Sequence, residues 1–164
     1  MPSSERVRLA DGAEVAGRFR ILSMLAEGRF GVVYSAEMLS GGASVMLKII
    51  GTEAQIGAED LARIRQEAEL LAVLRHPHIV KIVDFGVTDE GNDYLAFEQL
   101  HGRTLQQAVA DGPHPGSFVG AVALQVLDAL ELVPADLVRV RVRTRDATRT
   151  PTVCLHARVA DVAA

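Results

Sequence analysis

Cysteine, tryptophan and long apolar runs are what this sequence lacks most. One cysteine among 164 residues excludes a disulfide within the chain and a zinc site built from several cysteines. No stretch reaches the roughly 18 consecutive apolar residues of a membrane span, and the N-terminal segment has no apolar core of signal-peptide length. These absences predict a cytoplasmic protein of a reducing compartment that makes no contact with a membrane.

An excess of positive charge is also missing. The 17 basic and 21 acidic residues give a formal net charge of −4, which argues against a whole-chain basic field for nucleic acid. Hydrophobic residues make up 49% and charged residues 23%, a balance typical of a folded domain. The length suits one ordinary domain.

Lysine is scarce, and the charges are unevenly spread. Lys48 and Lys81 stand against 15 arginines. Residues 1–138 hold 11 basic and 19 acidic side chains, a net of −8, whereas residues 139–164 hold six arginines and two aspartates, a net of +4. The end of the chain, residues 134–164, is therefore predicted to be a divergent Arg-rich tail.

The hydrophobic pattern predicts an α+β fold behind a polar leader, residues 1–18. Runs rich in branched and aromatic residues predict strands over residues 19–25, 32–39, 45–50, 79–85 and 94–100. Helical spacing of apolar residues predicts helices over residues 58–74, 104–110 (with Thr104 as the N-cap) and 117–133. Strict alternation over residues 138–143 predicts an exposed strand with which residues 152–162 could pair, so the tail is expected to be irregular or a β-hairpin.

Two short features of the predicted sheet suit phosphate chemistry. Gly28 and Gly31 lie in the turn between the first two strands, where backbone N–H groups can cradle a phosphate, although such a hairpin is more often structural. Lys48 lies in an apolar strand, where a buried ammonium group needs a partner. The alternative is an exposed edge lysine whose stem snorkels.

A glutamate on the apolar side of the predicted helix 58–74 favours a buried Lys48 over an exposed edge lysine. At about 100° per residue, Glu67 falls inside the arc of apolar side chains, where a carboxylate needs a cation or hydrogen-bond donors. Lys48 is the candidate cation. Lys81 is the competitor, but it alternates with apolar neighbours and is expected to face solvent.

Five segments follow one another in a familiar order: a glycine turn, a strand lysine, a helix glutamate, an H-P-H connection and a final strand. They are residues 25–34 (LAEGRFGVVY), 45–48 (VMLK), 65–71 (RQEAELL), 74–80 (LRHPHIV) and 94–105 (YLAFEQLHGRTL). Together they resemble the N-terminal lobe of a protein kinase, most of all that of the bacterial Ser/Thr kinases. The resemblance covers residues 19–133, with the N-lobe at 19–100 and the hinge and first C-lobe helices at 101–133. It implies a five-stranded antiparallel sheet with one helix.

The resemblance also implies a nucleotide site for ATP, with Mg²⁺ expected alongside. Gly28 and Gly31 would lie over the phosphates, and Lys48 would hold the α- and β-phosphates and pair with Glu67. Phe97 would be the gatekeeper at the back of the pocket. Leu25 and Val33 would cover the adenine, and the backbone of the hinge, Glu98 to Leu100, would bind its edge. The implied nucleotide-binding residues are therefore Leu25, Gly28, Gly31, Val33, Lys48, Glu67, Glu98 and Leu100.

Two residues in this region depart from the family pattern. Ala26 stands in place of the first glycine of G-x-G-x-x-G, and its methyl group restricts the loop. Met46 stands in place of the alanine of V-A-x-K, which contacts adenine in the family, so methionine is expected to narrow the pocket.

The catalytic half of the family pattern is not found in these 164 residues. No H-R-D-x-x-x-x-N occurs, and Asp136, followed by leucine as a catalytic aspartate often is, has Arg141 where the magnesium-binding asparagine should be. Asp84-Phe85-Gly86 precedes the hinge rather than following a catalytic loop, so it is expected to end the fourth strand in a turn. His76 and His78 lack a further ligand at metal-binding spacing, so no metal site is predicted.

The sequence therefore predicts a truncated Ser/Thr protein-kinase-like domain with an ATP-binding lobe, and no phosphoryl transfer by this chain alone. One alternative is a pseudokinase-like interaction module, in which a protein partner covers the apolar helix 117–133. The other is a non-functional product of a disrupted kinase gene, whose tail comes from a frameshift or a truncated gene model. Nucleic-acid binding by the tail is not expected, because no aromatic residues alternate with its arginines.

Overall fold

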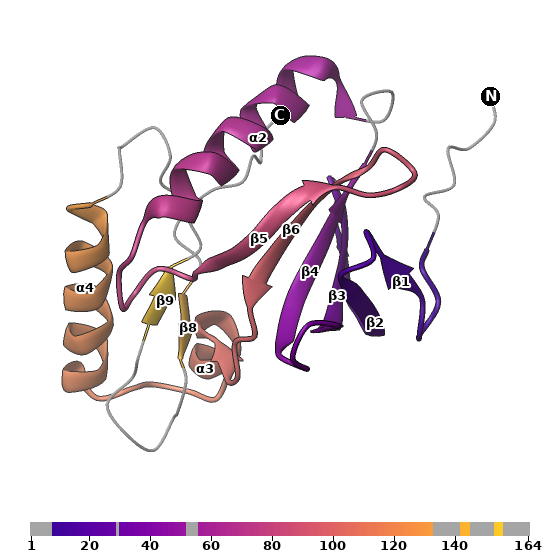
Figure 1. The fold of residues 1–164 in the computed structure, drawn as a ribbon. Coiled ribbons are helices and arrows are strands. Elements are labelled where there is room, and N and C mark those ends of the chain that lie inside the picture. The colour runs from indigo at the N-terminus through magenta and orange to yellow at the C-terminus, as the bar shows by residue number, and fades with distance from the viewer. Residues whose placement is uncertain (1–7, 29, 52–55, 133–141, 145–152, 156–164) are drawn as a thin grey trace, which may run out of the picture. The chain divides into compact units, whose positions relative to one another are not determined.

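The computed structural model describes residues 8–28, 30–51, 56–132, 142–144 and 153–155 (Figure 1). The chain divides into two compact units. The first consists of Met1–Ala72 and Ile82–Gln99, and the second of Val73–Lys81 and Leu100–Ala164. Asp136 and most of the predicted tail strand, Arg141 included, lie outside the described residues.

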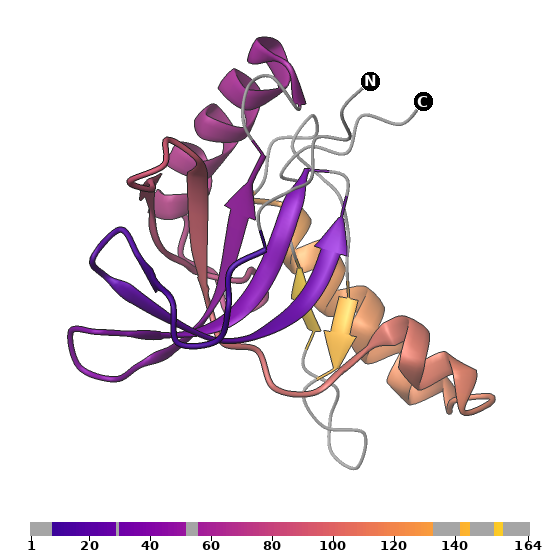
Figure 2. The ribbon, with the colours of Figure 1, turned by 90° about the vertical axis from the view of Figure 1, so that its right-hand side faces the viewer.

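An antiparallel sheet of six strands forms most of the first unit. In chain order the strands are β1 (Glu14–Val15), β2 (Phe19–Gly28), β3 (Gly31–Met38), β4 (Ser44–Ile50), β5 (Ile82–Val87) and β6 (Asp93–Glu98). Their order across the sheet is β1-β2-β3-β4-β6-β5, and every neighbouring pair is antiparallel. β2, β3 and β4 are long and bent, so the sheet curls (Figure 2). The predicted α+β class and the five predicted strands are confirmed.

Two features of the sheet differ from the sequence-based expectation. β1 is an additional strand, in which Val15 is buried and pairs with Phe19 of β2. β5 begins at Ile82 instead of Ile79. Ile79 is buried in the core of the second unit, together with Val122 and other apolar side chains, so its apolar character serves a different core.

Alternation along the strands gives the sheet two different faces. Residues paired directly across two strands point to the same face, and every second residue along a strand shares it. The core face carries the buried cluster Val15, Phe19, Ile21, Val32, Tyr34, Ala36, Val45, Leu47, Tyr94 and Ala96. The opposite face of β3, β4 and β6, called the outer face below, carries Val33, Met46, Lys48, Leu95 and Phe97.

The helix α2 (Ala58–Val73) matches the predicted helix 58–74. Glu59 and Asp60 lie in its first turn, where the positive end of the helix dipole favours acidic side chains. The helix ends before His76-Pro77, because the residue that precedes a proline avoids helical geometry. Its buried residues are Leu61, Ile64, Glu67, Ala68 and Leu71.

The described part of the second unit contains two helices and a small sheet. Thr104 is the N-cap of α3 (Leu105–Ala110), as predicted, and it forms a reciprocal capping box with Gln107. α4 (Gly116–Leu130) corresponds to the predicted apolar helix. β7 (Arg103–Thr104), β8 (Val142–Thr144) and β9 (Val153–Leu155) form an antiparallel sheet, in which β8 and β9 agree with the predicted hairpin.

Candidate functional site

The turn between β2 and β3 is shorter than the sequence pattern indicates. β2 continues through Ala26 to Gly28, and Gly28 pairs with Gly31 at the start of β3. Ala26 pairs with Val33 inside the ladder, in an extended geometry that alanine adopts freely. The alanine that replaces the family's first glycine therefore lies in β2, next to a shift of register between Met24 and Ala26, and its methyl group is outside the turn.

Lys48 lies in a central strand, on the outer face of the sheet. It pairs with Val33 of β3 on one side and with Leu95 of β6 on the other. Two residues earlier on the same face, Met46 pairs with Phe97. Lys48 is half-buried and Met46 is buried. The alternative of an edge lysine is wrong, because β4 has a neighbouring strand on each side.

Glu67 is buried on the inner side of α2, with 4% of its surface exposed. Its position on the helical wheel is thereby confirmed. Lys48 and Glu67 each take part in an interaction within the structure. Ile64 and Ala68 of α2 line a cavity together with Leu95, the residue that pairs with Lys48. The helix that carries Glu67 therefore lies against the outer face, one strand away from Lys48.

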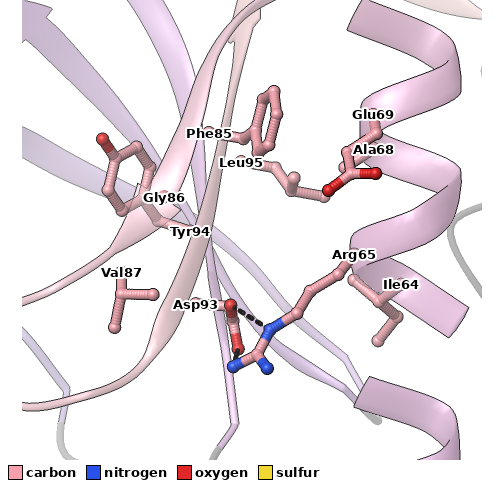
Figure 3. A pocket seen from close by; sticks show the side chains of 10 residues that line it. All are labelled: Ile64, Arg65, Ala68, Glu69, Phe85, Gly86, Val87, Asp93, Tyr94 and Leu95. Carbon is pink, nitrogen blue, oxygen red and sulfur yellow. Dashed lines mark hydrogen bonds and ion pairs between the residues drawn. The ribbon is translucent and has the colours of Figure 1, made fainter. Parts of the chain in front are cut away.

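The cavity between α2 and the strands β5 and β6 has a volume of about 160 Å³ (Figure 3). Leu95 points from β6 toward the helix, and the guanidinium group of Arg65 reaches the carboxylate of Asp93 at the start of β6. This ion pair could not be predicted from the sequence, because Arg65 lies outside the apolar arc and Asp93 falls between two predicted strands. The one feature of the sequence that points to a role for Arg65 is its position directly beside the apolar arc of the helix, next to Ile64.

The other predicted site residues divide between the two units. Leu25, near the end of β2, is half exposed, and Val33 is half-buried. Glu98 ends β6 and is half-buried. Leu100 is buried and belongs to the second unit. An exposed leucine beside a glycine turn suits contact with an apolar ligand surface, since covering it on binding is favourable.

Asp84-Phe85-Gly86 lies inside β5, and the expectation that it forms a turn is wrong. Tyr94 on the paired strand β6 contacts Asp84 and explains why position 86 is glycine. Its hydroxyl donates a hydrogen bond to Asp84 Oδ2 (2.9 Å), and a Cβ at Gly86 would come within 3.0 Å of that hydroxyl. Burial, and after it the hydrogen bond to Asp84, raises the pKa of Tyr94. Asp84 also forms an ion pair with Arg18 (3.1 Å), so the motif serves packing around Tyr94.

Two histidines of the second unit converge on one carboxylate. His76 Nε2 lies 3.2 Å and His78 Nε2 lies 3.8 Å from Asp128 Oδ2 on α4. The His78 backbone N–H donates a hydrogen bond to His76 Nδ1 (3.2 Å), which places the proton of a neutral His76 on Nε2, facing Asp128. These contacts join the H-P-H connection to α4. Within the described ranges, no cluster of three or more His, Cys, Asp or Glu side chains could hold a metal ion.

Among the described residues, none of the helices combines the length and the apolar character needed to cross a bilayer.

The chain is similar to known proteins over most of its length. The model of the protein kinase domain matches residues 19–138. The serine/threonine-protein kinase pkn2 of Myxococcus xanthus is 36% identical over 125 residues, which are 75% of this chain and 15% of that protein. The carbon catabolite-derepressing protein kinase of Candida albicans is 41% identical over 123 residues, 74% of this chain and 20% of that protein. The chain thus spans a fifth or less of the length of these two relatives.

Solved structures agree with this assignment. The crystal structure of the PknI kinase domain of Mycobacterium tuberculosis matches with a TM-score of 0.71 at 25% identity, over 92% of this chain and 62% of that one. A double mutant of the same domain matches with a TM-score of 0.76 at 25% identity, over 94% of this chain and 64% of that one. Proteins of this family generally use ATP and Mg²⁺. Since the family model covers more than half of the sequence, the chain belongs to the protein kinase family, as part of a kinase domain homologous to Ser/Thr kinases.

Proposed function

We propose that the first unit is the nucleotide-binding lobe of a Ser/Thr protein kinase and that it binds ATP together with Mg²⁺. The observation that carries the proposal is the position of Lys48. Its side chain leaves the sheet on the outer face, between Val33 and Leu95, and α2 with the buried Glu67 packs against that same face. A half-buried cation on this face and an inward carboxylate on the helix that covers it are the two groups that a phosphate anchor needs.

The residues present fit a nucleotide in their chemistry. Lys48 supplies a positive charge to the phosphates, and Glu67 holds the lysine in position. The Gly28–Gly31 hairpin offers backbone close to the phosphates. Leu25 and Val33 provide apolar surface for adenine, and the backbone around Glu98, at the end of β6, provides hydrogen-bonding groups for its edge. When bound, ATP would supply the γ-phosphoryl group that kinases transfer.

Met46 sets a limit on this fit. It is 6% exposed and pairs with Phe97 on the outer face, two residues from Lys48. A methionine side chain there occupies volume that alanine leaves open in the resembled family. We therefore expect ATP to bind more weakly than in a lobe with alanine at this position.

Phosphoryl transfer by these 164 residues alone is not part of the proposal. Transfer depends on groups that place the substrate hydroxyl and the magnesium ion, and the sequence contains no H-R-D-x-x-x-x-N motif. We expect the purified polypeptide to bind nucleotide without phosphorylating a protein. Transfer of labelled γ-phosphate to a general protein substrate, abolished by Lys48→Ala, would show that this expectation is wrong.

A binding module is the second candidate function, and α4 favours it. Val119, Leu124 and Leu127 of this helix are each more than half exposed. An exposed apolar helix face is typical of a surface that binds another protein. Size-exclusion chromatography of the purified chain tests this candidate: self-association removed by Leu124→Ser would support it, and a monomer at high concentration would count against it.

The direct test of nucleotide binding is a thermal unfolding series with MgATP. A ligand that binds only the folded state raises the unfolding temperature, and the rise continues with the logarithm of the ligand concentration above the dissociation constant. We expect the unfolding temperature to rise in this way with nucleotide concentration, and to rise less when Mg²⁺ is removed. An unchanged unfolding temperature at millimolar MgATP would overturn the proposal.

A further inference from the structure

Arg65 and Asp93 form a two-pronged ion pair between α2 and β6. The Arg65 Nε donates to Asp93 Oδ1 at 2.8 Å, and the Arg65 Nη2 donates to Asp93 Oδ2 at 2.9 Å (Figure 3). Asp93 is 6% exposed, so its carboxylate depends on these donors. Two parallel charge-assisted hydrogen bonds fix the angle of the guanidinium plane as well as its distance.

The position of Arg65 on α2 allows its ion pair with Asp93 to affect the rotation of the helix. With Ile64 as the centre of the buried arc, Arg65 lies about 100° to one side and Glu67 about 60° to the other, at 100° per residue. Glu67 therefore lies at one edge of the buried arc, and Arg65 lies just beyond the opposite edge. A rotation of α2 about its own axis that turned Glu67 out of the interior would also move Arg65 away from Asp93, its partner on β6.

The place of Asp93 on the strand completes the geometry. Asp93 and Leu95 are two residues apart on β6, so they share a face and lie about 7 Å apart. Leu95 pairs with Lys48 and lines the cavity with Ile64 of α2. One face of β6 therefore holds both the anchor point of α2 and the neighbour of the candidate phosphate-binding lysine.

We propose that the Arg65–Asp93 ion pair is a latch that sets the rotation of α2 and so keeps Glu67 turned toward the Lys48 side of the sheet. The proposal rests on the nucleotide-binding function proposed above. Arg65 and Asp93 are positioning residues, because they act on nucleotide binding through the helix and do not touch the ligand. A lysine at position 65 would keep the charge but lose the two-pronged geometry.

The test compares four variants with the wild-type chain: Arg65→Gln, Asp93→Asn, the double variant, and Arg65→Lys. Arg63→Gln is the matched control, since Arg63 is an exposed arginine of the same helix. Native-state amide hydrogen exchange of residues 58–73 reports opening of α2 without any nucleotide, and exchange of β2, β3 and β4 reports global unfolding. Fluorescence titration with a labelled ATP analogue and Mg²⁺ reports affinity.

The latch predicts that Arg65→Gln and Asp93→Asn each speed exchange of α2 at least about tenfold, the factor that one charge-assisted hydrogen bond supports, while exchange of β2–β4 changes less. Both variants should weaken nucleotide binding about tenfold, within the usual range of coupling between sites. The double variant should be no worse than either single one, Arg65→Lys should be intermediate, and Arg63→Gln should match the wild type.

Three results would overturn the latch: unchanged exchange of α2, an equal gain of exchange in α2 and in β2–β4, or faster exchange of α2 with unchanged nucleotide affinity. If the wild-type chain binds no nucleotide, the proposed function fails, and the exchange data still decide whether the ion pair holds α2. The two failures are therefore distinguishable.

Discussion

Gly31 lies so close to Ile49 that a Cβ on Gly31 would fall 1.9 Å from the Ile49 carbonyl oxygen. Its φ of +155° adds to this constraint, because side chains rarely tolerate that backbone conformation. Gly28, its partner across the turn, is different: a Cβ there would meet only the Gly31 carbonyl oxygen, at 3.9 Å. The two glycines of the candidate phosphate loop thus have different physical reasons for being glycine.

The first prediction follows from that difference. Gly31→Ala should lower the free energy of unfolding by about 3 kcal/mol, because the clash is with backbone atoms that cannot rotate away. Gly28→Ala should change the free energy of unfolding by no more than about 0.5 kcal/mol. Urea unfolding of the two variants and the wild type measures both values. Equal losses in the two variants would contradict the register of β3 and β4.

The second prediction concerns pH and the Tyr94 hydroxyl. Burial and the hydrogen bond to Asp84 raise the pKa of Tyr94 above its ordinary value of 10.0, so the folded chain favours the neutral phenol. This contribution to stability is fully present below pH 10 and is lost as the pH rises through the raised pKa. An NMR titration of the Tyr94 ring should therefore give a midpoint above 10.0.

Asp84→Asn provides the control for that titration. Removing the charge should move the Tyr94 pKa back toward 10.0 without restoring it fully, because burial is the larger cause. Tyr94→Phe should weaken the decline of stability in strong base, measured by urea unfolding. A Tyr94 midpoint at or below 10.0 in the wild-type chain would contradict the described environment.

The third prediction concerns Met46 as the residue that narrows the pocket. Met46→Ala should lower the free energy of unfolding by about 2–3 kcal/mol, because it removes a buried side chain. It should nevertheless tighten MgATP binding, since it opens space on the outer face. Val45→Ala is the matched control, because Val45 is a buried neighbour that faces the core cluster. Calorimetric titration should show tighter binding for Met46→Ala alone; a gain in both variants, or in neither, would contradict this role.

Local patterns were sufficient where composition or one periodicity dominated. The strands β2 to β4 are rich in branched and aromatic residues, which located them, and α2 buries one side, so the helical wheel located this helix and placed Glu67 inside. The same wheel could not identify Arg65, because its partner Asp93 comes from another element and the pairing depends on tertiary packing. The predicted start of the fourth strand at Ile79 was wrong for a related reason. The sequence shows that Ile79 is apolar, but it does not show which of the two cores buries the side chain.

Very short strands and accidental motif matches are the other features that the sequence could not predict correctly. β1 has two residues, Glu14 and Val15, and pairing with β2 rather than its own composition makes it a strand. Asp84-Phe85-Gly86 spells a kinase motif, yet contact with Tyr94 accounts for its aspartate and its glycine. Neither pairing nor contact across strands is visible in a local pattern of residues.

A calorimetric titration of MgATP into the wild-type chain, Lys48→Met and Lys81→Met tests directly whether Lys48 anchors ATP. Methionine keeps most of the length and apolar stem of lysine and removes the charge. Lys81, the sole other lysine, is exposed and serves as the matched control. We expect binding by the wild type and Lys81→Met, and a loss of affinity of at least about tenfold in a folded Lys48→Met. Equal affinity in Lys48→Met and the wild type, or no binding by the wild type, would contradict it.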